Sequence, residues 1–465
     1  MTTEPTPSKF KPYTRQTIFL ARQWRWLSAD QQEAVQVMSH VMPFRTNEFV
    51  LEQLIDWNKL PDDPIFRLTF PQRDMLPAEE YAQLREQVLF KKNGAAIADM
   101  VRKIQMRMNP RWAGQATHDV PMLDGVPQRG LQHKYEDTVQ FFPSAAQTCH
   151  AHCTSCGRPP QFATMDAMKL DARAAAGLVT YLRAHPEVSD VLITGGDPLV
   201  MPTDALAECI EPLLAPELAH IRSIRIDTRS VAWWPHRFVT GGDSGELLRL
   251  FERVAGSGKR LAIMGHYSHP VELRNGVAQQ AVRCLVASGA SLWMQGPLMR
   301  HVNDDPASWA ELWGTGMRLG AIPHSMFAGR DMGPHDYFSV PLARANEVFH
   351  ATCRTLPGLA GILNGPSMSV PAGKIALNGI VSINGEQLFA LQFLAARNPD
   401  WVRRPFFARF DPDATGFHQL VPAFGRKQFF FQPTDAGVTR HGNVIPIVPA
   451  VRDGLPERRG TPELA

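Results

Sequence analysis

The chain has 465 residues, 44% of them hydrophobic, enough for two or three domains with a sizeable core, and this excludes a disordered or fibrous protein. The 48 basic and 45 acidic side chains leave a formal charge of +3, too near balance to predict a nucleic-acid or membrane partner. With no apolar targeting segment at the start and no apolar run long enough to span a bilayer, we expect a cytoplasmic protein.

Residues 1–120 are expected to form an N-terminal helical region. Apolar side chains recur at helical spacing in residues 30–41 and 78–107, on either side of a proline-rich connection at 60–76. Nothing in this region has the pattern of a catalytic site.

Residues 121–340 alternate short apolar runs with amphipathic helical segments. Strands are expected at 137–142, 190–193, 223–226, 260–264, 291–294 and 318–326, and helices at 172–184, 204–213, 245–255, 275–287 and 306–317. This alternation predicts a parallel α/β sheet curled into a partial barrel.

Ligands of such a sheet bind beyond the carboxyl ends of its strands, so the residues that follow each apolar run should face the site. A cysteine cluster follows the first run and Gly195-Gly196-Asp197 follows the second. The next three runs are followed by Asp227-Thr228-Arg229, His266 and Gln295 in turn.

The C-terminal segment, residues 341–465, begins with a helix at 342–355. A hairpin is expected at 375–391, with turns at Asn378-Gly379 and Asn384-Gly385. The extension beyond it is rich in aromatic residues, including 404–407 and 429–431, and is expected to be packing surface.

Three of the six cysteines, Cys149, Cys153 and Cys156, are spaced as C-x3-C-x2-C. Three thiolates on one tight loop can hold three irons of a four-iron cluster and leave the fourth open to a substrate. A structural zinc site that uses these cysteines with His150 or His152 is the alternative. The other cysteines, Cys209, Cys284 and Cys353, lie in helical segments and are expected to be core thiols.

Gly195, Gly196 and Asp197 form a second motif. Two glycines after a strand let a ligand approach the backbone, and the carboxylate can accept hydrogen bonds from an ammonium group. The same tripeptide is also typical of an ordinary strand-to-helix connection in which the aspartate caps the helix.

In their order along the chain these motifs resemble the radical S-adenosylmethionine superfamily and, within it, the lysine 2,3-aminomutase family. The resemblance covers roughly residues 60–385. It rests on the cysteines and on the segments 130–135, 194–199, 266–270, 298–304 and 371–374.

The resemblance implies a partial (β/α)6 barrel of the radical SAM type, with the N-terminal helical region and the C-terminal extension added. It implies a 4Fe-4S cluster on the three cysteines, with S-adenosyl-L-methionine chelating the open iron. Its methionine ammonium would be held by Gly195, Gly196 and Asp197, and its nucleoside would lie near Arg229, His266 and Gln295.

By the same resemblance Lys374 would hold pyridoxal 5'-phosphate and Arg158 would bind the substrate α-carboxylate. Without the resemblance, Lys374 would be interpreted as a solvated lysine before a strand and Arg158 as a surface arginine. Gly373 gives the backbone before Lys374 the freedom that a pocket lysine needs, which favours the cofactor interpretation.

Lysine-specific members of the family use two aspartates for the distal ammonium group. One aligns with Asp331, which with Arg330 could equally form an exposed ion pair, and the other position holds Ser369. The substrate is therefore expected not to be simply lysine. The zinc cysteines of some members are also missing, since the matching early position holds Asp305, so no zinc is predicted.

The resulting hypothesis is an isomerase, an amino acid 2,3-aminomutase that moves an amino group from the α to the β carbon through a 5'-deoxyadenosyl radical. The alternatives are the same cofactors acting on a protein lysine, a different radical reaction on an amino acid, and a zinc-stabilised non-enzymatic binding protein. The expected partners are a free amino acid and a reductant such as flavodoxin or ferredoxin. The sequence leaves open whether the chain forms a homo-oligomer.

Overall fold

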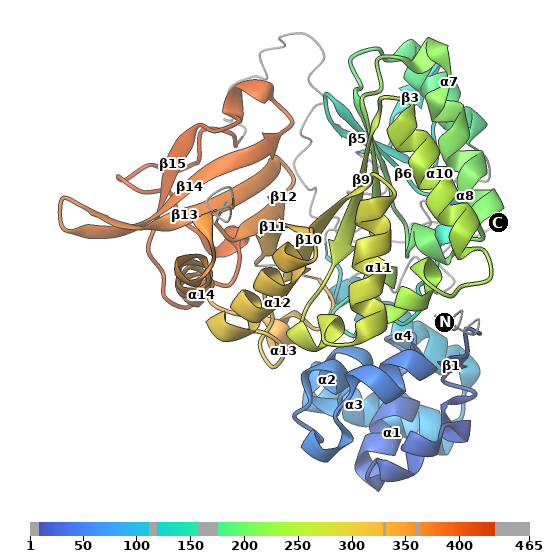
Figure 1. Ribbon diagram of the computed structural model, residues 1–465. Coiled ribbons are helices and arrows are strands. Elements are labelled where there is room, and N and C mark those ends of the chain that lie inside the picture. Colours follow the sequence, from blue (N-terminus) through green and yellow to red (C-terminus); the bar gives the residue numbers. More distant parts are fainter. Residues whose placement is uncertain are drawn as a thin grey trace, which may run out of the picture.

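The computed structural model describes residues 9–110, 119–156, 175–328, 332–358, 363 and 365–432 (Figure 1). Eleven strands form one sheet, in the order β15-β14-β13-β12-β11-β10-β9-β8-β7-β6-β5. Within these ranges, no helix is long and apolar enough to cross a membrane.

Six neighbouring strands of the sheet run parallel, each one paired in register with the next. They are β6 (Thr138–Phe141), β7 (Asp190–Ile193), β8 (Ser223–Thr228), β9 (Arg260–His266), β10 (Ser291–Pro297) and β11 (Ile322–Phe327). The connecting helices are α7 (Ala176–Ala184), α8 (Thr203–Ile210), α9 (Ser230–Trp233), α10 (Ser244–Gly256), α11 (Gly276–Ala287) and α12 (Pro306–Arg318). The predicted partial (β/α)6 barrel is confirmed.

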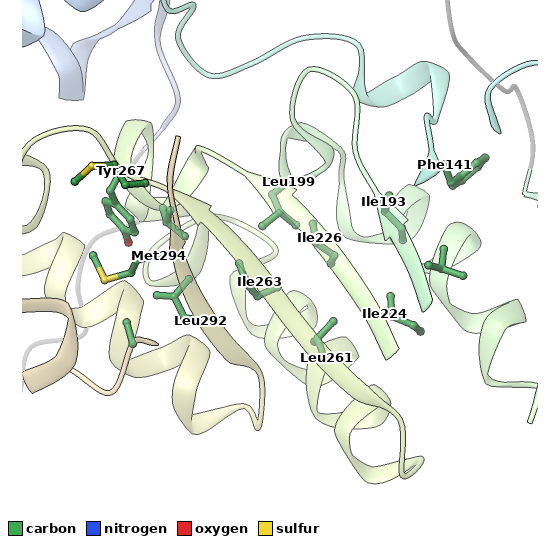
Figure 2. Close-up of a cluster of buried hydrophobic side chains, with 14 of the residues drawn as sticks. Phe141, Ile193, Leu199, Ile224, Ile226, Leu261, Ile263, Tyr267, Leu292 and Met294 are labelled. Atoms are coloured by element: carbon green, nitrogen blue, oxygen red, sulfur yellow. The ribbon is translucent and has the colours of Figure 1, made fainter. Parts of the chain in front are cut away.

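Alternation along the strands decides which side chains meet the helices and which face the inside of the barrel. In β8, Ile224 and Ile226 are fully buried, whereas Arg225 and Asp227 point to the opposite face and stay partly exposed. Figure 2 shows Ile193, Ile226, Ile263 and Leu292 side by side on successive strands, forming the core beneath the helices. The polar face is thereby left to line the site.

The N-terminal region lies beside the barrel (Figure 1). It has its own cluster of buried side chains. It contains the helices α1 (Ala29–Met38), α2 (Pro64–Thr69), α3 (Ala78–Arg85) and α4 (Gly94–Arg107), and the two-stranded sheet of β1 (Pro12–Thr14) and β2 (Arg45–Asn47). Barrel residues, including Trp233, Met299 and Phe338, complete its core. The region is therefore attached to the barrel through buried apolar contacts.

The short helix α13 (His335–Phe338) and the longer α14 (Leu342–Thr355) follow β11 and lead into the antiparallel part of the sheet. Its strands are β12 (Ser367–Val370), β13 (Gly373–Ile383), β14 (Glu386–Ala396) and β15 (Pro405–Arg409). At the other end of the sheet, β5 (Leu131–Tyr135) pairs with β6. A separate two-stranded sheet consists of β3 (Met122–Leu123) and β4 (Val126–Pro127). Among the described residues, β12 joins β11 through one registered pair, Phe327 with Ser367. The buried cluster of the barrel continues into these strands and includes Phe406, Phe429 and Phe431.

Three sequence predictions were wrong in detail. The helix expected over 78–107 is interrupted by a π-helical stretch, Glu86–Lys91. This stretch ends at Lys92, whose φ is 52°, and a new helix, α4, begins after its N-cap Asn93. The strand expected from Arg318 begins at Ile322, because Arg318 still belongs to α12. Only Asn384-Gly385 forms a hairpin turn, while Gly379 lies at an irregularity inside β13.

Candidate active site

The loop that carries the three cysteines follows β6 and is fastened to the N-terminal region by backbone hydrogen bonds. His152 N donates to Arg45 O and Thr154 N donates to Leu68 O, both at 2.8 Å. Cys156 N donates to Cys153 O at 3.1 Å, which closes the loop on itself. The backbone of the predicted cluster loop is thus held on two sides.

The two histidines within the loop are engaged with neighbouring elements. His150 Nδ1 lies 2.8 Å from Ser230 Oγ, and His152 Nδ1 lies 2.8 Å from Pro43 O. Burial lowers the pKa of His150 to about 3 and that of His152 to about 4. Both imidazoles serve to fix the loop, and the part of the chain that is described contains no group of three His, Cys, Asp or Glu side chains arranged for a single metal ion.

All three cysteines line one cavity of about 220 Å³ at the carboxyl ends of the strands. Thiols are soft donors, and three of them in one cavity suit an iron-sulfur cluster with one open iron. Burial raises the pKa of the Cys153 thiol, and the nearby Arg229 guanidinium opposes this rise. The wall of this cavity also includes Gly196, Asp227, Arg229, His266 and Phe327.

Gly196 brings the backbone after β7 against the cysteine loop. A Cβ at this position would lie 2.4 Å from Thr148 O and 2.6 Å from Thr148 N, so no larger residue fits. The sequence predicted that a glycine here lets a ligand approach the backbone. In the structure the backbone of Thr148 makes this close approach to Gly196, and Gly196 also lines the cavity.

Asp197 is buried and its carboxylate accepts four hydrogen bonds from the protein. Oδ1 accepts from Leu199 N at 2.9 Å and Thr228 Oγ1 at 2.7 Å, and Oδ2 accepts from Arg229 N at 2.8 Å and Ser230 Oγ at 3.0 Å. This carboxylate holds the ends of β7 and β8 together and caps the turn Pro198–Val200. The capping alternative is the one these contacts show.

Asp227, His266 and Gln295 meet across three neighbouring strands. Gln295 and His266 are registered partners on β10 and β9. His266 Nε2 lies 2.7 Å from Asp227 Oδ1, and Gln295 Nε2 donates to the same oxygen at 2.9 Å. The structure therefore brings His266 and Gln295 together with Asp227, which the sequence placed at the same edge of the sheet without giving it a role.

Arg229 points into the same region from the end of β8. Its Nη2 donates to the fully buried Glu272 at 2.8 Å and to Ser268 Oγ at 3.1 Å, and its guanidinium lies 4.1 Å from the centre of the Trp233 ring. Glu272 holds this arginine at the cavity wall and was not found from the sequence, because a single acid in a loop has no distinguishing spacing.

Lys374 lies on β13, on the antiparallel side of the sheet. Its Nζ donates to Ser325 Oγ at 3.2 Å and lies 4.9 Å from the centre of the Phe327 ring. Phe327 also lines the cavity that holds the three cysteines. Ser369 is the registered partner of Lys374 on β12, so the two side chains share one face of the sheet, and Ser369 is exposed.

The carbonyl groups that precede Lys374 are fixed by two basic residues. Lys134 Nζ donates to Val370 O at 2.8 Å, Arg397 Nε donates to Pro371 O at 2.8 Å, and Arg397 N donates to Ala372 O at 3.0 Å. Arg397 also forms an ion pair with Asp119. The sequence assigned this support to neither residue, although Lys134 lies in the segment 130–135 that carries part of the resemblance.

Two predicted substrate contacts, Arg158 and Asp331, lie outside the described residues, as does Arg330.

The chain is similar to several curated proteins. It is 28% identical over 351 residues to a protein of Aquifex aeolicus (strain VF5), covering 75% of this chain and 81% of that one. It is 30% identical over 287 residues to a protein of Treponema pallidum (strain Nichols), covering 59% and 74%. Both are described as "Putative L-lysine 2,3-aminomutase".

A more distant relative is the glutamate 2,3-aminomutase of Clostridioides difficile (strain 630), 23% identical over 222 residues, 48% of this chain and 49% of that one. Among solved structures, a radical SAM methyltransferase from Sphaerobacter thermophilus has a TM-score of 0.35 and 18% identity, covering 51% of this chain and 68% of that one. No family model matches the chain.

Proposed function

The chain belongs to the lysine 2,3-aminomutase family of radical S-adenosylmethionine enzymes, and from this we propose that it is a pyridoxal-phosphate-dependent amino acid 2,3-aminomutase. Its substrate is an amino acid that lacks the distal ammonium group of lysine. The single observation that carries this proposal is the position of Phe327, which lines the cysteine cavity on one side and lies under Lys374 on the other.

The cluster with S-adenosylmethionine would supply a 5'-deoxyadenosyl radical, and pyridoxal phosphate would carry the migrating nitrogen. Cys149, Cys153 and Cys156 would hold three irons. The donor set fits this group because three thiols share one partly enclosed cavity.

The polar residues at the strand ends would bind the nucleoside half of S-adenosylmethionine. Asp227, His266 and Gln295 are already fixed by one another, and Arg229 is fixed by Glu272. A network that is formed before the ligand arrives loses little conformational freedom on binding. Asp197, with four protein donors, would act by positioning these strand ends, and Gly196 would offer its backbone to the methionine group.

Lys374 would hold pyridoxal phosphate covalently. Its Nζ donates to Ser325 Oγ and lies over the ring of Phe327, the residue that also lines the cysteine cavity, so the amine is held close to the proposed cluster. Gly373 and the fixed carbonyls before it set where the side chain points.

The described wall of the cavity supports a substrate other than lysine. Asp227 is its one carboxylate, and that group accepts from Gln295 and Thr194 and lies against His266. Ser369 supplies a neutral hydroxyl where lysine-specific relatives are expected to have an aspartate. A buried ammonium group without a carboxylate partner loses several kcal/mol, which is on the order of a hundredfold in affinity.

The test is an anaerobic assay of the protein reconstituted with iron, sulfide and pyridoxal phosphate. Amino acids including lysine, glutamate and alanine are supplied in turn with S-adenosylmethionine and dithionite, and 5'-deoxyadenosine and β-amino acids are measured. We expect a β-amino product from at least one amino acid, with lysine about a hundredfold slower. Deoxyadenosine without any β-amino product would replace the aminomutase by another radical reaction.

Ser369→Asp should raise lysine turnover, and Ser382→Asp, on the exposed part of β13, is the matched control that should leave it unchanged. Efficient lysine turnover by the wild type would overturn the substrate assignment and leave the reaction class intact. A peptide that contains lysine is included in the panel, because turnover of the peptide alone would move the activity to a protein substrate.

A further inference from the structure

Two buried N–H groups beside the cysteine loop have no acceptor in hydrogen-bond geometry among the described residues. They are Trp233 Nε1 on α9 and Arg45 Nε on β2. Buried donors without acceptors are rare in native proteins and carry a free-energy cost, so each one calls for an explanation.

Trp233 is completely buried between the N-terminal region and the barrel. Cys153 packs against the buried cluster that contains Trp233, and one amide, Asn47 Nδ2, donates both to Trp233 O and to His150 O, so the indole lies against the cysteine loop. The Arg229 guanidinium stacks on its ring at 4.1 Å, so the indole is held in one orientation. A cluster sulfur is the acceptor that this donor lacks.

Arg45 reaches the loop from the N-terminal region. Its carbonyl accepts from His152 N, and its guanidinium lies 5.6 Å from the centre of the Phe10 ring. That Phe10 ring lies 4.9 Å from the ring of His150, the residue that follows Cys149, so the guanidinium is held at the start of the cysteine loop. A positive donor thus lies beside the first cysteine and a neutral one beside the second.

We propose that Arg45 and Trp233 donate hydrogen bonds to the sulfurs of the cluster at Cys149 and Cys153 and thereby raise its reduction potential. The inference rests on the proposed function, since it assumes a cluster on these cysteines. One electron from an external reductant makes the cluster more negative, and no bond forms or breaks in that step. N–H donors and a positive charge stabilise the reduced form more than the oxidised form.

Both residues are positioning residues that act through the cysteines, so the test measures potential and not turnover. Trp233→Phe removes the N–H and keeps an aromatic ring under Arg229. Arg45→Lys keeps a positive charge and removes the buried Nε. Each reconstituted variant is titrated with dithionite at controlled potentials, and the reduced cluster is counted by electron paramagnetic resonance, without S-adenosylmethionine.

We expect full iron and sulfide content in both variants and a reduced-to-oxidised ratio about tenfold lower at a given potential, which is about 59 mV for a one-electron couple. Trp313→Phe is the matched control. It makes the same change in a buried tryptophan of α12, packed against Trp309 and Phe349, and should not move the potential.

Loaded Trp233→Phe with a wild-type potential would overturn the inference while leaving the proposed function standing. An equal shift in Trp313→Phe would also overturn it, because loss of packing alone would then explain the change. Wild-type protein that takes up no four-iron cluster would contradict the proposed function itself, so the two failures are distinguishable.

Discussion

Lys374 and Lys134 are the two lysines beside the segment proposed to hold pyridoxal phosphate. Lys374 lies next to Ser325 and Phe327, whereas Lys134 donates to the carbonyl of Val370. Burial lowers the pKa of Lys134 to about 8, so this amine loses its proton more easily than an ordinary lysine. Lys134 is therefore the alternative residue to which the cofactor could bind covalently. Position relative to the cavity, and not basicity, favours Lys374.

Lys374→Ala should abolish covalent binding of pyridoxal phosphate, because the amine that attacks the cofactor is removed. Borohydride treatment of the loaded wild type, followed by peptide mass spectrometry, should find the cofactor on Lys374. Lys91→Ala, an exposed lysine paired with Glu86, is the control and should bind normally. Cofactor fixed on Lys134 instead would show that the assignment chose the wrong lysine.

The burial of Lys134 should make the free energy of unfolding depend on pH. Its pKa is about 8 in the folded protein and near 10.5 when unfolded, so between these values the unfolded chain binds more protons and the free energy of unfolding rises with pH. Relative to Lys134→Met, wild type should gain about 3 kcal/mol from pH 8 to pH 10.5. Urea unfolding of both proteins across this range measures the gain, and a constant difference would contradict the burial of this ammonium group.

At the residue scale, the sequence was informative where spacing carries the chemistry. The cysteine spacing located three thiols that do share one cavity, and the glycine pair located a real close approach. Arg45 and Lys134 could not be found in this way, because each is a single basic residue whose neighbours come from distant parts of the chain. Asp197 shows the same limit, since sequence alone could not separate capping from ligand binding.

Among the elements, the strands of the barrel were predictable because apolar runs between amphipathic helices have few alternatives. The carboxyl ends of β8, β9 and β10 then had to bring Asp227, His266 and Gln295 to one edge. Boundaries were less predictable. The backbone of Lys92 is left-handed, although the helical spacing of apolar side chains continues on both sides of it. That spacing therefore could not predict the end of the helix at Lys92.

The junction of β13 and β14 gives a prediction at this scale. A Cβ at Gly373 would lie 2.2 Å from Ala395 O, so Gly373→Ala must push the two strands apart just before Lys374. We expect a loss of about 1–3 kcal/mol in the free energy of unfolding and weaker binding of pyridoxal phosphate. Gly256→Ala, with open space around its Cβ, is the control; equal effects in the two variants would contradict the strand-spacing argument.

For the whole molecule, the main feature is that the N-terminal region covers the cysteine loop. Asn47, completely buried, donates from Nδ2 to His150 O at 3.2 Å and to Trp233 O at 3.0 Å, and accepts from Val50 N at 3.1 Å. One side chain therefore joins three parts of the chain. The sequence indicated a helical region here but gave no sign that it supports the site, because these contacts span more than a hundred residues.

Asn47→Ala should lower the free energy of unfolding by about 1–3 kcal/mol, because two buried carbonyls lose their donor. The reconstituted variant should also lose iron faster in air, since the loop is less well covered. Circular dichroism melts and iron release over time measure the two effects. Asn58→Ala changes an exposed asparagine that donates to Asp56 on the surface, and it should alter neither quantity. Unchanged iron release in Asn47→Ala would show that the cover does not protect the cluster.

The single registered pair between β11 and β12 has a consequence for the distance between the two reactive centres. Neighbouring strands on the cysteine side are joined by four to six registered pairs each, whereas the strands that separate the cysteines from Lys374 share Phe327 with Ser367. Among the described residues, the sheet therefore has its shortest strand pairing at the line between the cysteines and Lys374. If the cluster and pyridoxal phosphate bind as proposed, a rotation at this line would change the distance between them while the strand pairing within each half stays intact.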